Sequence, residues 1–218
     1  MPTALPLTPI SLPTSSSVRP DWYSSRAFAS HVWGGVEGGV FPVHADARSL
    51  PFAPGFFDAI VAIDSFYYYG TDDLYLNYLA QFVRPGGPIG IAGAGLVQEI
   101  EEAVPEHLRA WWTQDLWALH SAAWWRRHWG RTGIVEVELA DTMPDGWQRW
   151  LDWHRAVAPD NATEIKAIEE DRGRFLGYVR AVGRRRAEAK LEEYCWPDTL
   201  RSSPPQYTKK LLLRSQEP

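Results

Sequence analysis

The chain has 218 residues and a mass of 24.7 kDa, which suits one domain or one domain with a small cap. Its formal charge of −5 gives no electrostatic basis for nucleic-acid binding, and its single cysteine, Cys195, excludes an internal disulfide framework and a multi-cysteine zinc site. No apolar run reaches transmembrane length, and no basic segment followed by an apolar core opens the chain. We therefore expect no signal peptide, no membrane partner and a cytoplasmic location.

The N-terminal segment has no regular hydrophobic pattern. Its prolines recur too often for a helix or a central strand: Pro2, Pro6, Pro9, Pro13 and Pro20. We predict that residues 1–33 are disordered or loosely packed, that residues 34–186 form a domain, and that residues 187–218 form an irregular tail.

Two short apolar runs, residues 59–63 and 89–92, contain no polar alternation and are bounded by turn residues. This pattern is typical of parallel strands that are buried on both faces. Between them, residues 72–83 place apolar side chains at helical spacing, with Thr71 or Asp72 as the cap. A strand, a helix and a strand in this order predict a parallel pair joined by a right-handed crossover.

Three short motifs follow one another in this region. They are Asp46-Ala47 with Leu50-Pro51-Phe52, then Phe57-Asp58, then Arg84-Pro85-Gly86-Gly87. In this order they resemble the C-terminal half of the nucleotide-binding fold of class I S-adenosylmethionine-dependent methyltransferases, particularly the small-molecule, methyltransferase type 11-like branch. The resemblance covers residues 35–182. It implies an α/β fold with an incomplete Rossmann-like, mostly parallel sheet and a Trp-rich helical insertion.

The resemblance also implies a strand order. We expect parallel strands at residues 40–44, 59–63, 89–92 and 134–139, and an antiparallel strand at the edge at residues 175–182. The strand at 40–44 is expected to pair directly with the strand at 59–63. Helices within residues 99–130 and 145–172 are expected to form the cap.

A section that the family places first is missing from the sequence. The family fold opens with a strand, a glycine-rich turn and a helix beside the cofactor. The glycines at 34–39 follow no buried strand and leave no room for a helix before Asp46, and those at 90–95 have the spacing of packing glycines. We therefore interpret the chain as truncated or remodelled at its N-terminal end. Either change would remove part of the site for S-adenosylmethionine.

Five residues are candidates for cofactor binding by this resemblance. Asp46 and Ala47 correspond to the adenine contacts, and Asp64, Ser65 and Phe66 would face the methionine end of S-adenosylmethionine. Asp46 is alternatively the cap of a turn. Asp64 is also a weak candidate for a catalytic base toward a substrate hydroxyl or amine, and alternatively a helix or turn cap.

Aromatic residues supply the candidates for a substrate pocket. Tyr67, Tyr68 and Tyr69 follow Asp64 and either line a pocket or pack the next helix onto the sheet. Trp117, from a segment that holds six of the twelve Trp residues, and His154 are the other candidates. Most of these Trp side chains are expected to bury a helix rather than to line the pocket. No metal site is expected, because His120 and His128 have no third ligand nearby in the sequence.

Two functions follow from these features. The first is methyl transfer from S-adenosylmethionine to a small molecule, with activity reduced or lost through the missing section. The second is a non-catalytic remnant that binds a ligand or partner with its aromatic half. An incomplete sheet would expose apolar surface, so we also expect aggregation or a homodimer.

Overall fold

The computed structural model describes residues 39, 41 and 43–191. The chain divides into two compact units, residues 1–45 and 46–218, and the second unit contains the helices and strands described below. The predicted N-terminal segment and most of the predicted tail lie outside the described residues, as do the glycines at 34–38.

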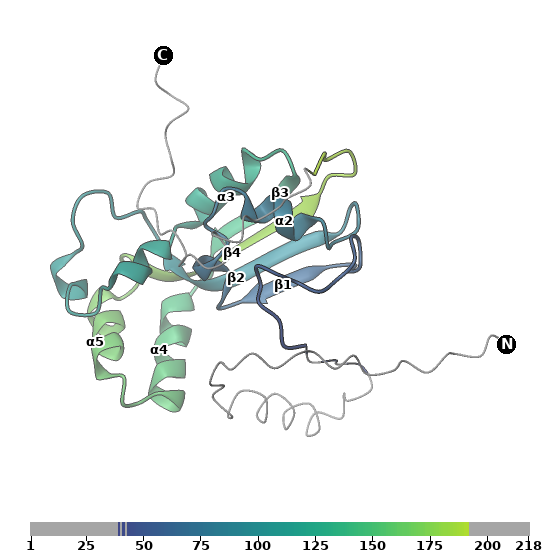
Figure 1. Ribbon diagram of the computed structural model, residues 1–218. Helices are drawn as coiled ribbons and strands as arrows, with labels where there is room; N and C mark the ends of the chain where they lie inside the picture. The colour runs from purple at the N-terminus through teal and green to yellow at the C-terminus, as the bar shows by residue number, and fades with distance from the viewer. Residues whose placement is uncertain (1–38, 40, 42, 192–218) are drawn as a thin grey trace, which may run out of the picture. The chain divides into compact units, whose positions relative to one another are not determined.

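A four-stranded sheet forms the centre of the second unit (Figure 1). Its strands are β1 (Ile60–Ile63), β2 (Pro88–Leu96), β3 (Val135–Thr142) and β4 (Leu176–Arg185), in the order β1-β2-β4-β3. β1 pairs with β2 in parallel, whereas β4 is antiparallel to both of its neighbours. Three strands therefore run in one direction and one in the other. The predicted α/β class with a mostly parallel sheet is confirmed.

Two predictions about strand positions are wrong. β4 does not lie at the edge, because it is hydrogen-bonded to β2 on one side and to β3 on the other. The described residues at 41, 43 and 44 do not form a strand, so the predicted pairing of residues 40–44 with β1 is not found among them. The link before β1 instead packs against a helix, since the Leu50 N–H donates to the Tyr78 hydroxyl at 2.6 Å.

β1 is not buried on both faces as its apolar sequence predicts. Val61 is 70% exposed and Ile63 is 56% exposed. The same face of the sheet carries exposed ion pairs, such as Arg180–Asp141 at 2.7 Å. An uninterrupted apolar run can therefore belong to a strand that is covered on one side only.

The described residues form four α-helices: α2 (Tyr75–Ala80), α3 (Ala122–Gly130), α4 (Gly146–Val157) and α5 (Ala162–Asp171). Short 3-10 helices precede them: η1 (Phe66–Tyr68), η2 (Glu106–Leu108) and η3 (Gln114–Ala118). The predicted helix at 72–83 is shorter than expected, because residues 72–74 form a turn in which the Asp72 carboxylate accepts from the Leu74 N–H. Within 99–130, only α3 is α-helical.

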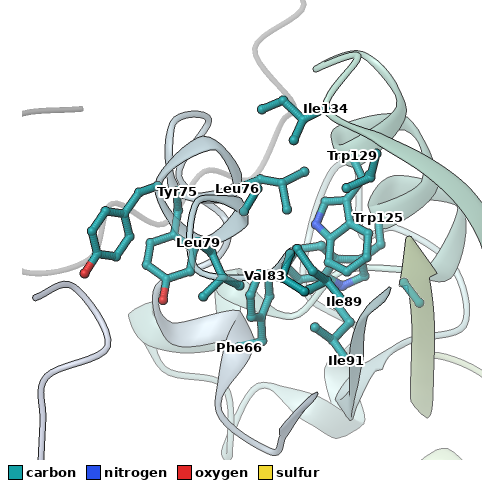
Figure 2. Packing of buried hydrophobic residues seen from close by; sticks show 14 of the residues in the cluster. Phe66, Tyr75, Leu76, Leu79, Val83, Ile89, Ile91, Trp125, Trp129 and Ile134 are labelled. Atoms are coloured by element: carbon teal, nitrogen blue, oxygen red, sulfur yellow. The ribbon is translucent and has the colours of Figure 1, made fainter. Parts of the chain in front are cut away.

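The larger hydrophobic core lies between α2, α3 and one face of the sheet (Figure 2). Phe66 is its central ring, with Trp125 at 5.6 Å and Trp129 at 5.8 Å between ring centroids. Both Trp side chains are buried, which supports the interpretation that much of the Trp-rich segment covers the sheet.

A second core lies at the carboxyl ends of β1 and β2. Here α4 and α5 lie side by side (Figure 1). Leu151 of α4 and Ile168 of α5 pack in the same cluster as Leu96 of β2 and Leu176 of β4. The two cores thus place the aromatic helical half next to the edge of the sheet at which ligands of open α/β folds bind.

Candidate functional site

The three sequence motifs meet in space. The Asp58 carboxylate accepts from Arg84 Nε at 2.7 Å, so the second and third motifs form an ion pair. The Phe52 ring of the first motif lies 4.7 Å from Phe57 of the second. Gly86 has a φ of +76° in the turn before β2, which glycine adopts without strain. The motifs therefore specify how the parallel pair is joined.

Asp46 and Asp64 lie near the same end of the sheet. Asp64 follows β1 directly and has a φ of 51°. From its neighbour Ser65, a series of contacts leads to Asp46. The Ser65 hydroxyl is 3.1 Å from the Tyr69 hydroxyl, and the Tyr69 and Tyr75 rings are 4.9 Å apart. Tyr75 then donates to the carbonyl oxygen of Ala47 at 2.9 Å.

The Asp46 carboxylate is held by Arg48. Arg48 donates from its backbone N–H at 2.8 Å and from its guanidinium at 3.0 and 3.2 Å. These hydrogen bonds lower the pKa of Asp46, chiefly through the guanidinium. An ionised carboxylate only accepts hydrogen bonds, which is the property needed to receive an exocyclic amino group.

Two of the cofactor candidates are engaged elsewhere in the fold. Phe66 is buried in the larger core, and a Cβ atom on Gly70 would lie only 2.0 Å from its ring. Its side chain therefore does not face a ligand site, and the prediction that Phe66 contacts the methionine end is wrong for the side chain. The Ser65 hydroxyl is paired with Tyr69, whose ring packs on Phe66 and Tyr75 rather than in a pocket.

A cavity of about 720 Å³ lies next to Asp64. Its floor crosses three adjacent strands, through Asp64 after β1, Ala94 of β2 and Tyr178 of β4. α4 closes one side, beginning at Gly146, where a Cβ atom would lie 2.7 Å from Tyr178 Cβ. The remaining walls come from the segment around η3, from η1 and from the first turn of α5.

Polar groups in the cavity wall are fixed by specific partners. Burial, followed by the nearby Asp64 carboxylate, raises the pKa of Tyr178, which keeps the phenol protonated. Across the cavity, His154 Nε2 lies 2.8 Å from Glu164 Oε1. Asn161 Nδ2 donates to Glu164 Oε2 at 2.7 Å.

The cavity contains four of the residues singled out from the sequence: Asp64, Tyr67, Tyr68 and His154. Trp117 is not in this wall, because its ring packs against Trp112 at 5.2 Å in the second core. Sequence reasoning missed several wall residues: Asp115, Arg149, Trp150, Trp153, Glu164 and Tyr178. The one available signal was the aromatic face of residues 147–154, which contains Trp150, Trp153 and His154.

The two remaining candidate histidines, His120 and His128, form part of a buried stack. The His120 and His128 rings lie 3.7 and 4.4 Å from the ring of Trp124, on which both stack. His128 donates from Nε2 to the Gly70 carbonyl at 3.1 Å. Burial, and then Arg131, lower the pKa of His128 to about 4, so its ring is neutral near pH 7. His128 thus connects α3 to the loop before α2.

No helix in the described part of the chain is both long and apolar enough to cross a bilayer. A family model described as a methyltransferase domain matches residues 25–91, a range that contains all three motifs. This match covers less than half of the chain, and together with the fold it supports a class I S-adenosylmethionine-dependent methyltransferase fold. The resemblance inferred from the sequence is confirmed.

The fold is also similar to solved structures at low sequence identity. SpnF, a (4+2)-cyclase, has a TM-score of 0.53 and 17% identity, over 74% of this chain and 62% of that chain. A second structure is geranyl diphosphate C-methyltransferase from Streptomyces coelicolor A3(2), in complex with Mg²⁺, geranyl diphosphate and S-adenosyl-L-homocysteine. Its TM-score is 0.54 and its sequence identity is 15%, over 72% of this chain and 56% of that chain. A third is phosphoethanolamine N-methyltransferase 2 from Haemonchus contortus, in complex with S-adenosyl-L-methionine. Its TM-score is 0.50 and its sequence identity is 16%, over 65% of this chain and 36% of that chain. The chain thus spans less than two thirds of the length of each.

Proposed function

We propose that this protein binds S-adenosylmethionine and transfers its methyl group to a small molecule held in the cavity beside Asp64. One observation carries the proposal: Asp64 belongs both to the section that matches the methyltransferase family and to the wall of the aromatic cavity. The family-like half and the helical half therefore meet at the carboxyl end of β1. Ligands of open α/β sheets bind at such strand ends.

The cofactor would be held by residues that remain available at this edge. The ionised Asp46 carboxylate suits the adenine amino group, and the Ala47 backbone lies beside it. Asp64 would lie near the methionine end, whereas the Phe66 side chain does not fit because it is buried in the core. When bound, S-adenosylmethionine supplies a methyl group on a positively charged sulfur.

The residues of the cavity would bind and orient the methyl acceptor. Correct placement of two reactants is a large part of catalysis when the donor is already reactive. Asp64, which shares the cavity wall with Tyr178, is placed to accept a hydrogen bond from an N–H or O–H of the acceptor. Aromatic side chains around it, including Tyr67 and Trp150, would exclude water.

Calorimetric titration of the full chain with S-adenosylmethionine tests this proposal. We expect saturable binding that Asp46→Ala weakens at least about tenfold. Arg48→Ala is the matched control, because it removes the same guanidinium contact but leaves the Asp46 carboxylate and its backbone hydrogen bond. Equal weakening by both variants would assign the effect to the turn rather than to adenine binding. Absence of heat at millimolar ligand would exclude independent methyl transfer.

A non-catalytic ligand-binding module is the second candidate. It is supported by the fact that the described residues of the cavity wall run from Asp64 to Tyr178 in the sequence. In addition, a fold of this kind does not fix methyl transfer as the activity, since SpnF is a cyclase. Ligand binding in the cavity without binding of S-adenosylmethionine would favour this candidate.

A further inference from the structure

The charges in the cavity wall are not balanced. Three carboxylates, those of Asp64, Asp115 and Glu164, lie in the wall with one guanidinium, that of Arg149. With His154 counted as neutral, three carboxylates against one guanidinium leave a formal excess of two negative charges. Carboxylates in a concave surface with low-dielectric walls focus a negative potential, which attracts cations and repels anions.

Neutral groups hold two of these carboxylates in place. The Thr113 hydroxyl donates to Asp115 and the Asn161 amide donates to Glu164, whose other oxygen lies 2.8 Å from His154 Nε2. A neutral donor fixes the orientation of a carboxylate without cancelling its charge. The wall therefore presents carboxylates to a ligand, two of them, Asp64 and Asp115, on exposed residues.

Six aromatic rings form part of the remaining wall. They are Tyr67, Tyr68, Trp111, Trp150, Trp153 and Tyr178. The rings of Trp111 and Trp150 are inclined by 63°, and those of Tyr67 and Tyr68 by 49°, so neither pair is stacked face to face. Such inclined rings leave aromatic surface available to a ligand. Ring faces attract cations electrostatically, and aromatic cages are a common way to bind organic ammonium groups.

We infer that the cavity binds an organic cation, such as a protonated amine attached to an apolar body. That the cation is the methyl acceptor rests on the proposed function. Binding of the cation itself depends only on the cavity. The carboxylates would neutralise the ammonium group, and the rings would cover both its alkyl groups and the apolar body. A phosphorylated or diphosphorylated ligand is disfavoured by the same charges.

The test uses three probes of similar size with the full chain: phenyltrimethylammonium, its neutral analogue tert-butylbenzene, and the anion benzenesulfonate. Quenching of Trp fluorescence reports binding, since Trp111, Trp150 and Trp153 lie in the wall. We expect phenyltrimethylammonium to bind at least about tenfold more tightly than tert-butylbenzene, and benzenesulfonate to bind more weakly than either. Equal or stronger binding of the neutral probe or the anion would overturn the inference, as would no binding of the cation.

Two charge-neutralising variants on α5 locate the effect. Glu164→Gln keeps the shape of a wall residue and is expected to weaken binding of phenyltrimethylammonium about five-fold or more. Glu169→Gln removes the same charge from an exposed residue of the same helix, outside the cavity wall, and is expected to have little effect. Equal effects of both variants would show that the cation responds to the overall charge of the protein, and would overturn the assignment to the cavity.

Parallel titration with S-adenosylmethionine separates the two proposals. Cation binding without binding of S-adenosylmethionine would uphold the cation site and overturn methyl transfer as the function. Binding of S-adenosylmethionine with no preference for the cation would uphold the cofactor site and overturn the cation as its substrate class.

Discussion

Removal of the Asp171 carboxylate is expected to destabilise the protein strongly. Asp171 is the last residue of α5 and is 0% exposed. Its carboxylate accepts from the backbone N–H of Leu176 at 2.8 Å and of Phe175 at 3.1 Å, and it pairs with His107 Nε2 at 2.8 Å. One buried charge thus connects α5 to the start of β4 and to η2.

The magnitude follows from these partners. Asp171→Ala would leave two backbone N–H groups without an acceptor, and an unsatisfied buried donor costs about 1–3 kcal/mol. The His107 side chain is 16% exposed and can turn to water, so it adds less. We expect a loss of about 3–5 kcal/mol, a large fraction of the roughly 5–15 kcal/mol that stabilises a typical domain. Asp171→Asn keeps one oxygen acceptor, so its free energy of unfolding should lie between those of the unchanged protein and Asp171→Ala.

Urea unfolding followed by Trp fluorescence measures this loss, and the melting temperature should fall by roughly 6–12 °C for each 3 kcal/mol. The matched control is Asp58→Ala, which removes a 92% exposed carboxylate paired with Arg84 at 2.7 Å. Such exposed pairs contribute at most about 1 kcal/mol. A loss for Asp171→Ala no larger than that of Asp58→Ala would refute the reasoning.

Two further predictions concern the larger core. Burial, and then Arg131, lower the pKa of His128 from 6.5 to about 4, so the unfolded chain takes up a proton at a higher pH than the folded chain. The free energy of unfolding should therefore fall by about 2 kcal/mol from about pH 7.5 to about pH 5. His128→Gln should flatten this pH dependence in urea titrations. A slope unchanged in His128→Gln would contradict the assignment. Phe66→Ala should lower the free energy of unfolding by about 3–5 kcal/mol in the same assay. An unaltered midpoint with weaker binding of S-adenosylmethionine would instead make Phe66 a ligand contact.

Local sequence was sufficient to predict the parallel unit of β1, α2 and β2. The apolar runs and the turn at Gly86 lie close together in the chain, so each constrains its neighbours directly. The predicted cap at Asp72 is wrong, because α2 begins after Leu74 and has no side-chain cap. Local sequence also accounts for the start of α5, where the Asn161 side chain accepts from the Glu164 N–H. The family motifs also predicted this unit, because Asp58 before β1 and Arg84 before β2 form an ion pair that links the starts of the two parallel strands.

The position of β4 and the composition of the cavity could not be predicted in this way. The apolar pattern of β4 does not distinguish an edge strand from a strand between two others. Its place is decided by hydrogen bonds to β2 and β3, which come from distant parts of the chain. Phe66 was misassigned for a similar reason. Its place next to Asp64 suggests a ligand contact, but the packing of α3 on the sheet turns its ring into the core.

The sequence by itself determined the order of the elements, the parallel pair and the resemblance to a methyltransferase, since these depend on neighbouring residues and on short motifs. Only the tertiary structure decided which side chains share a site. Asp64, Tyr178 and Glu164 come from three separate elements, and they meet because the carboxyl ends of β1 and β2 lie beside the start of β4 and under α4 and α5. Their separation along the chain does not predict that these three side chains lie together, because hydrophobic packing between non-local elements places them there.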